Sequence, residues 1–422
     1  MHAANELLRP SVPVVLDQHV EEAAHLRHVR SVQVRAPHVR LMNLERLDER
    51  IAAHLDGIAV AGEAGAVRCR QALASPSSGT LFVATVGALE ARDMARLDAL
   101  LDVGQALPET VPGLLSAFGW VTPGCLRGVT AALLDSPQAW RREAGLAACE
   151  LQGVDPQEAV RPALAAAAPV LRRRALRVAG RLGRRDLLQA CVDALDDGEC
   201  AFEAARAALL LGDRRAALPA LEAHAAGGGP FAPSALALVL LALPGERARE
   251  HLARLAQDAG GARTVVRGIG LVGDPHFVPW LVARMDDPAL ARAAGESFAL
   301  LTGLDLAYLD LERPVPPEVP AGPTDDPQDG DVAMDEDESL PWPDPGRIAA
   351  WWQANALRFP AGGRFFMGAQ PSPAHCMTVL RQGFQRQRQV AAVHLCLAKP
   401  GAPLFNTAAP AWRQKRWLDA MA

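Results

Sequence analysis

The sequence has little lysine and few aromatic residues. Only two of its 43 basic side chains are lysines, and aromatic residues make up 5% of its 422 residues. Acidic residues outnumber basic ones by 48 to 43, and the resulting net charge of −5 excludes a globally basic nucleic-acid-binding protein. Because half of the residues are apolar and so few are aromatic, the core must be built mainly from aliphatic side chains.

Long hydrophobic runs and paired cysteines are also missing. The longest nearly uncharged apolar run, residues 231–244, has 14 residues, fewer than the roughly 17 to 20 that span a bilayer. Residues 1–10 show no basic flank followed by an apolar stretch, so we expect no secretory signal there. The seven cysteines are scattered without a CxxC pair, which is typical of a reducing compartment. We therefore expect a cytoplasmic protein without a transmembrane span.

Alternating β-branched residues are nearly absent, so a β-sheet has little to be built from. What the chain does contain is a repeat, in which a glycine follows an Ala/Leu-rich run. Each interval can hold two helices of about a dozen residues and their turns, which is the unit of an α-solenoid of stacked helical hairpins. The glycines are 28 to 34 residues apart, at Gly87, Gly119, Gly153, Gly183, Gly212, Gly245, Gly273 and Gly303.

The pattern of side chains within one interval also predicts a helical hairpin. In residues 169–182 the apolar side chains follow helical spacing, and arginines fill most of the other positions. Residues 187–195 repeat the pattern, and Gly183 lies between the two segments, where a left-handed helix end favours glycine. Helix starts are indicated by proline after a capping residue, at Thr122-Pro123, Ser136-Pro137, Asp155-Pro156, Asp274-Pro275 and Asp287-Pro288. We predict an all-α fold.

The composition changes sharply after about residue 312. Residues 314–346 contain nine prolines and ten acidic residues without Lys or Arg, and residues 335–338 are an unbroken acidic run. Such a segment cannot bury enough apolar surface to order itself, so we expect a linker or an exposed loop. Residues 347–422 then carry ten basic residues and one acidic residue. The predicted regions are an N-terminal helical region (1–78), a solenoid (79–312), an acidic Pro-rich linker (313–346) and a basic helical C-terminal module (347–422).

Motifs for catalysis or for cofactors are weak. Residues 268–273 spell GxGxxG, but they lie at the end of a predicted helix rather than between a strand and a helix. His25 and His28 lack a standard spacing of metal ligands, and the pairs His375-Cys376 and His394-x-Cys396 fall among apolar helical positions. Residues 295–299 resemble a nucleophile elbow without its closing glycine or the strand before it. We predict no catalytic residue, no cofactor and no metal ion.

Arginines recur at the start or along the second helix of successive predicted repeats. In a solenoid these helices often line the concave surface, and the planar guanidinium group forms paired hydrogen bonds with carboxylates. The alternative is an ordinary solvated face. The basic C-terminal module could contact phosphates, but the acidic linker beside it could equally dock there. The candidate partner-binding residues are Arg185, Gln189, Arg215, Glu222, Arg249, Arg254, His276, Arg284, Arg386 and Arg388.

Two runs one repeat apart, Leu-Gly-Arg-Arg-Asp-Leu-Leu at 182–188 and Leu-Gly-Asp-Arg-Arg-Ala-Ala-Leu at 211–218, resemble short HEAT-type repeats of the lyase-like variety. That resemblance covers about residues 79–303. With the motifs at 35–38, 44–50, 54–57, 385–392 and 409–411, the chain resembles a proteobacterial HEAT-repeat-like family often encoded beside type VI secretion genes. The resemblance implies an accessory, adaptor or chaperone-like role. It supplies no catalytic residues.

Stacked hairpins without a credible catalytic set predict a non-enzymatic scaffold or adaptor that binds a protein cargo, with a type VI effector as one candidate. We expect a protein partner rather than nucleic acid, and the oligomeric state stays open. One alternative is a HEAT-like lyase or glycosylase, for which Asp274, His276 and Trp280 are the residues to test. Another is an immunity protein. A further hypothesis is that the acidic linker occupies the arginine-bearing face or the basic module until cargo displaces it.

Overall fold

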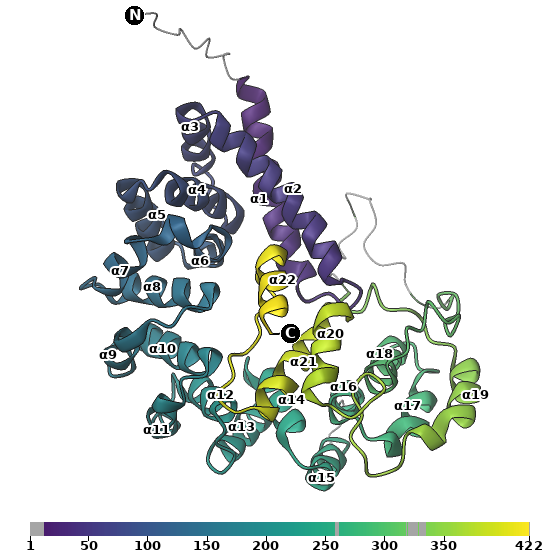
Figure 1. The fold of residues 1–422 in the computed structure, drawn as a ribbon. Coiled ribbons are helices and arrows are strands. Elements are labelled where there is room, and N and C mark those ends of the chain that lie inside the picture. The colour runs from purple at the N-terminus through teal and green to yellow at the C-terminus, as the bar shows by residue number, and fades with distance from the viewer. Residues whose placement is uncertain (1–11, 258–260, 318, 320–327, 329–334, 422) are drawn as a thin grey trace, which may run out of the picture. The chain divides into compact units, whose positions relative to one another are not determined.

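A computed structural model describes residues 12–257, 261–317, 319, 328 and 335–421 (Figure 1). Within these residues the chain forms 22 α-helices and no β-strand. Consecutive helices contact their neighbours in the chain, which confirms the predicted all-α, solenoid-like class. The contacts divide the chain into two compact units, and the division falls within helix α10 (Pro169–Leu182). No helix in the described ranges has both the length and the apolarity that a membrane crossing requires.

Unit 1 holds residues 12–35, 41–178 and 408–421 of the described chain. Helix α1 packs on α2, and α4, α6 and α8 stack in order, with α5 and α7 beside them. Its core is aliphatic, as the composition predicts, with Phe82, Phe118 and Trp120 among the few aromatic members. Its helices are α1 (Pro13–Gln33), α2 (Leu41–Val60), α3 (Glu63–Ala72), α4 (Ser78–Ala91), α5 (Met94–Ala106), α6 (Val111–Trp120), α7 (Val129–Leu134), α8 (Ala139–Gln152), α9 (Val160–Leu164) and α22 (Ala411–Ala420).

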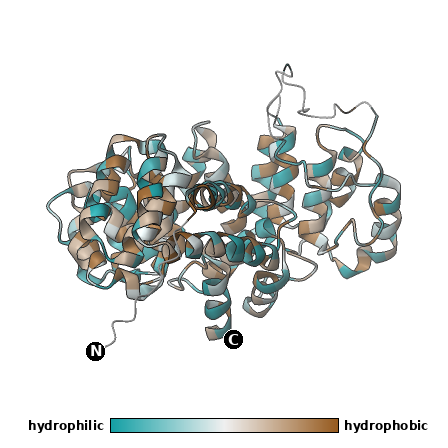
Figure 2. Cartoon of the chain, turned by 90° about the horizontal axis from the view of Figure 1, so that it is seen from above, coloured by the Kyte–Doolittle hydropathy of each residue, from teal (hydrophilic) through white to brown (hydrophobic). Residues whose placement is uncertain are grey.

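Unit 2 holds residues 36–40 and the described part of residues 179–407. Helices α12, α14, α16 and α18 stack in order, and α20 packs on α21, which contacts α12 and α14. Its helices are α11 (Leu188–Asp193), α12 (Ala201–Leu211), α13 (Ala217–Ala226), α14 (Ala232–Ala242), α15 (Gly245–Leu255), α16 (Ala262–Val272), α17 (Val278–Arg284), α18 (Ala291–Thr302), α19 (Pro345–Asn355), α20 (Pro373–Gln382) and α21 (Gln385–Ala398). Most helices carry both hydrophobic and hydrophilic residues, as Figure 2 shows, because one face is buried and the other is solvated.

The repeat predicted from glycine spacing is present. The first helices of successive hairpins, α8, α10, α12, α14, α16 and α18, begin at residues 139, 169, 201, 232, 262 and 291. Five of the eight repeating glycines end such a helix with positive φ, at Gly153, Gly183, Gly212, Gly273 and Gly303. The other three have different places, since Gly87 and Gly119 lie inside α4 and α6 and Gly245 begins α15.

The unit boundaries differ from the predicted regions. Helix α22 belongs to unit 1, whereas α20 and α21 belong to unit 2, so the basic C-terminal residues do not form one module. Composition marks where a sequence changes character, but it does not show which distant surface each segment covers. In the acidic run at 335–338, Asp335, Glu336 and Glu338 are exposed as expected, but Asp337 is only 2% exposed.

In unit 2 the segment around residues 364–404 covers the carboxyl ends of the first helices. The last carbonyl groups of a helix have no partner within the helix and must be satisfied from outside. The amide groups of Phe365, Met367 and Leu404 donate to carbonyls of Gly273, Leu300 and Arg181 at 2.7, 2.6 and 2.8 Å. The approach is so close that a Cβ atom on Gly183 would lie 2.1 Å from the carbonyl oxygen of Gly401. The repeating glycines therefore admit the C-terminal segment as well as ending the helices.

Arg364 satisfies two helix ends at once. Its guanidinium group donates to the carbonyl oxygens of Leu240, Leu241 and Leu243 at the end of α14, at 3.0, 2.7 and 2.9 Å, and to that of Val272 in α16 at 3.1 Å. Burial, with a smaller contribution from the nearby Arg214, lowers the pKa of Arg364. The carboxyl ends of helices carry partial negative charge, which favours a guanidinium group at this position.

In unit 1, helix α22 supplies a hydrogen-bond donor to the carbonyl groups at a helix end. Arg413 is 3% exposed and donates to the carbonyl oxygens of Gly119 and Val121 at the end of α6, the latter at 3.0 Å. The edge of Trp412 meets the ring of Trp120, with centroids 4.7 Å apart. Trp412 and Arg413 of α22 thus pack against α6 within unit 1, whereas Lys415 and Arg416 are exposed.

Asp48 connects α22 to the N-terminal hairpin. Its side chain is fully buried and accepts hydrogen bonds from the guanidinium group of Arg30 and, at 2.7 Å, from the backbone N–H of Ala411. Arg30 also donates to the carbonyls of Ala408 and Ala409, at 2.9 and 3.0 Å. The structure therefore brings together the motifs at 44–50 and 409–411. Nearby, Lys415 pairs with Glu45 at the surface.

Replacing Asp48 with alanine should lower the free energy of unfolding by about 3 kcal/mol, because it leaves the largely buried Arg30 and the first amide of α22 without their acceptor. Glu45→Ala, which removes an exposed ion pair to the same helix, should cost less than about 1 kcal/mol. Chemical denaturation of the full chain measures both changes. Equal losses in the two variants would show that Asp48 has no special role.

His394 in α21 should make stability depend on pH. Burial lowers its pKa to about 4, with Arg364 and His375 contributing. The unfolded chain takes up this proton near pH 6.5, so the free energy of unfolding should fall between pH 6.5 and 4, by about 3 kcal/mol in total. Chemical denaturation across this range should show that the free energy of unfolding changes less steeply with pH for His394→Gln than for the exposed control His25→Gln. Identical slopes would contradict the assignment.

Candidate functional site

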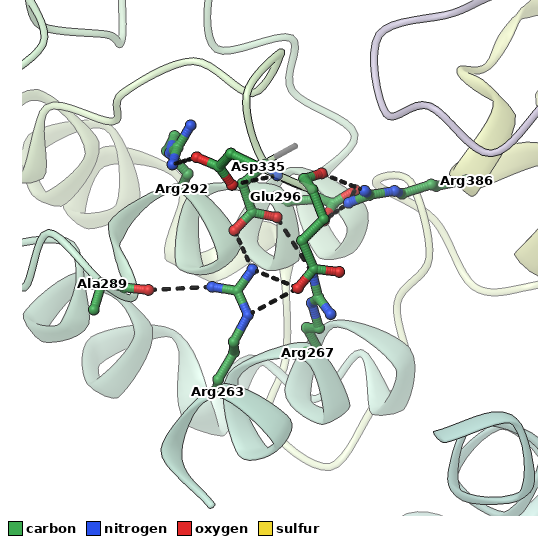
Figure 3. A network of polar contacts seen from close by, with 9 residues as sticks. Arg263, Arg267, Ala289, Arg292, Glu296, Asp335 and Arg386 are labelled. Carbon is green, nitrogen blue, oxygen red and sulfur yellow. Dashed lines mark hydrogen bonds and ion pairs between the residues drawn. The ribbon is translucent and has the colours of Figure 1, made fainter. Parts of the chain in front are cut away.

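A cluster of four arginines lies on unit 2, formed by Arg263 and Arg267 of α16, Arg292 of α18 and Arg386 of α21 (Figure 3). Arg263 and Arg267 are one helical turn apart and lie on the same face of α16. Helices α16 and α18 pack together, so Arg292 comes from the helix that stacks next to them. We call these four residues the arginine cluster.

The occupants of the arginine cluster come from the acidic run. Asp335, Glu336 and Asp337, here called the acidic triplet, each pair with at least one of its members. Arg263 bonds to both Glu336 and Asp337, and its Nη2 lies 3.0 Å from Oε1 of Glu336. Arg267 Nη2 lies 3.0 Å from the same Glu336 oxygen and 3.2 Å from Oδ1 of Asp337. Arg292 pairs with Asp335.

Arg386 joins the triplet to a carboxylate of α18. Its Nη1 donates to both carboxylate oxygens of Glu296, at 3.0 and 2.8 Å, and its Nη2 donates to the backbone carbonyl of Glu336 at 2.8 Å. Burial raises the pKa of Glu296 although Arg386 opposes the change. The cluster therefore recognises both the backbone and the side chains of the triplet.

The arginine cluster favours the charged forms of Glu336 and Asp335. Burial acts to raise the pKa of Glu336, but the hydrogen bonds and charges of Arg267 and Arg263 outweigh it, so the pKa lies below its ordinary value. The pKa of Asp335 is lowered as well, since its hydrogen bonds, including that from Arg292, outweigh burial. Arg263 and Arg267 are 32% and 37% exposed, and exposed ion pairs typically contribute only ~0.2–1 kcal/mol each. The pairs of Asp335 and Glu336, whose side chains are 47% and 59% exposed, are of this kind, whereas those of Asp337, which is 3% exposed, are partly buried.

One donor of the cluster is not used by the triplet. Arg292 stacks over the ring of Trp342, 4.7 Å from its centroid, and its Nε is buried without an acceptor among the described residues. A carboxylate that approached both Nε and Nη2 would form the bidentate pair that guanidinium groups favour. Asp335 accepts a hydrogen bond only from Nη2 of Arg292.

Most of the predicted partner-binding residues lie on the second helices of unit 2 or on the short turns before them. Arg185, Gln189, Arg215, Arg254, His276 and Arg284 are exposed. Others are engaged within the unit, as Glu222 pairs with Arg247, and Arg249 with Asp274. In Figure 1 the helices α11, α13 and α15 lie on the side of unit 2 away from α20 and α21. The structure does not bring them together with the arginine cluster, apart from Arg386.

The prediction for Arg388 is wrong. Its side chain is fully buried and donates to the carbonyl of Leu380 at 2.7 Å and to the side chain of Gln385. Burial lowers its pKa to about 10. A side chain enclosed in this way cannot contact a partner, and its role is to hold α20 against α21.

The residues considered for a glycosylase or metal site have other roles. Asp274 is 3% exposed, pairs with Arg249 and caps the turn at His276, and Trp280 lies under the guanidinium group of Arg284. His375 bonds through Nε2 to the carbonyl of Phe366 at 2.8 Å. Within the described ranges, no three His, Cys, Asp or Glu side chains gather as metal ligands would.

Sequence reasoning missed Arg263, Arg267, Arg292 and Glu296. The signal was present, because Arg263 and Arg292 occupy equivalent positions of neighbouring repeats and both helices precede the acidic run. The prediction placed the important arginines on the second helices, whereas those that bind the triplet are on first helices. Compared with known protein families, curated proteins and solved structures, the chain shows no match.

The pair of Arg386 and Glu296 should be coupled. Arg386→Gln should lower the free energy of unfolding by about 2 kcal/mol, because Glu296 loses its bidentate partner in a partly buried site. The double variant with Glu296→Gln should recover part of this loss, giving a coupling energy above about 1 kcal/mol. Arg215→Gln, at an exposed position of unit 2, is the control and should change stability by less than about 0.5 kcal/mol. Additive effects in the cycle would exclude the coupling.

Proposed function

We propose that this protein is a non-enzymatic scaffold or adaptor that holds a protein partner, and that the arginine cluster of unit 2 is part of its binding surface. The observation that supports the proposal is the acidic triplet itself. Three consecutive acidic residues are bound there by guanidinium groups, with a backbone carbonyl recognised by a fourth arginine. A face that binds one acidic segment of polypeptide has the chemistry to bind another.

The repeat architecture supports the same proposal. A stack of helical hairpins exposes a large surface for its length, and such proteins commonly bind other proteins. The resemblance to a family encoded beside type VI secretion genes makes a secreted effector the first partner to test. The trio Asp274, His276 and Trp280 gives the glycosylase alternative little support, since the carboxylate of Asp274 is buried and paired.

The proposal predicts a partner among the products of adjacent genes. Tagged full-length protein should recover that partner in pull-down experiments, and native mass spectrometry should detect the complex. Replacing Arg263, Arg267 and Arg292 with glutamine should weaken binding at least about tenfold.

The matched control replaces Arg185, Arg215 and Arg284, three exposed arginines of the second-helix face, and removes the same charge. It should leave binding nearly unchanged. If the control variant alone lost binding, the second-helix face would be the binding surface. If the wild-type chain captured no partner, the scaffold proposal would fail.

A further inference from the structure

We infer that the acidic triplet competes with the partner for the arginine cluster, and that the partner binds the cluster through an acidic segment of its own. This inference rests on the proposed function and specifies the chemistry of the partner and the control of access. The segment would place clustered Asp or Glu side chains where Asp335, Glu336 and Asp337 now lie.

Charge complementarity points to an acidic occupant. The arginine cluster has four guanidinium groups and one carboxylate of its own, Glu296, whose charge Arg386 balances. The remaining three arginines face the three carboxylates of the triplet. Without the triplet, three cationic groups that are 15 to 37% exposed would be left near one another. Any segment that replaced the triplet would have to supply similar negative charge.

The contacts of the triplet are those of a replaceable ligand. The ion pairs of Asp335 and Glu336 are in contact with solvent, where salt screens charges over about 8 Å at physiological ionic strength, and only Asp337 is buried. The buried Nε of Arg292 has no acceptor among the described residues, so a better placed carboxylate would gain a hydrogen bond there. The advantage of the triplet is that it belongs to the same chain, which raises its effective concentration to the millimolar range.

The fold of the triplet is local. The amide of Asp337 donates to Oδ1 of Asp335 at 2.9 Å, and the amide of Leu340 donates to the carbonyl of Asp337 at 2.8 Å. Both bonds form within residues 335–340, and the Asp335 side chain that accepts the first is held by Arg292. Release of the triplet would break its ion pairs and the bond from Arg386 to the carbonyl of Glu336, and would expose Asp337, but it would break no backbone hydrogen bond within the helices.

The test uses the full chain and a fluorescent peptide with the sequence of residues 335–342, Asp-Glu-Asp-Glu-Ser-Leu-Pro-Trp. The variant Asp335→Asn/Glu336→Gln/Asp337→Asn should bind this peptide at least about tenfold more tightly than the wild-type chain does, by fluorescence anisotropy at low salt. Adding Arg263→Gln and Arg267→Gln should abolish the gain. The matched control Asp196→Asn/Glu199→Gln/Glu250→Gln neutralises three exposed acids elsewhere in unit 2 and should behave like the wild-type chain.

Two results would overturn the inference. The first is equal binding of the peptide by the wild-type chain, the triplet variant and the control. The second is that single-stranded DNA of similar charge binds the triplet variant more tightly than the peptide, which would assign the cluster to phosphates. Thermal melting establishes that each variant is folded. If the triplet variant does not fold, hydrogen exchange on the wild-type chain replaces it, and added polyglutamate should speed exchange at the amides of Asp337 and Leu340. Unchanged exchange would count against the inference.

The experiment also separates this inference from the scaffold proposal. A partner captured equally well by wild type and by the Arg263→Gln/Arg267→Gln variant would leave the scaffold proposal standing and remove the arginine cluster from it. Peptide binding without any captured partner would support the exchange of acidic segments at the arginine cluster and count against the scaffold proposal.

Discussion

The carboxyl ends of short helices need hydrogen-bond donors, and much of this structure follows from that requirement. Each first helix is only about three turns long, so its last unsatisfied carbonyls are a large share of its polar groups. The chain supplies donors from its C-terminal part, through Arg364 and the amides of Phe365 and Met367 in unit 2 and through Arg413 in unit 1. The C-terminal segment is therefore a structural part of both units.

The arginines of this protein fall into two groups by what they bind. Arg364, Arg388 and Arg413 are buried or nearly so and donate mainly to backbone carbonyls, and burial lowers the pKa of each. Arg263, Arg267 and Arg292 are partly exposed and bind carboxylates of the acidic triplet. Only the second group can exchange its ligand without leaving a helix end unsatisfied. This difference is why we place partner recognition at the arginine cluster.

Arginine suits both uses because its guanidinium group has several donors in one plane and stays charged at neutral pH. Arg386 combines the two uses, since it binds the carboxylate of Glu296 and the backbone carbonyl of Glu336 at the same time. A lysine could not match this geometry, and the sequence has only two lysines.

The sequence by itself determined the helical class and the repeat. Helical spacing of apolar residues and recurring glycines depend on contacts within one hairpin, and these are local. The change at residue 312 was also visible, because it is a matter of composition. The exposure predicted for the acidic run is found at Asp335 and Glu336 but not at Asp337. The contacts that order the triplet could not be predicted, because they come from arginines about 40 to 70 residues away in the chain.

The tertiary structure alone decided which charges meet. Arg386 and Arg388 are two residues apart in the sequence, yet one reaches Glu296 and the acidic triplet while the other is enclosed between α20 and α21. Likewise, Asp48 looks like one more acid in a charged helix until folding places the start of α22 over it. Side chains of one type differ in role because burial and long-range pairing, rather than local pattern, set the free energy of a charge.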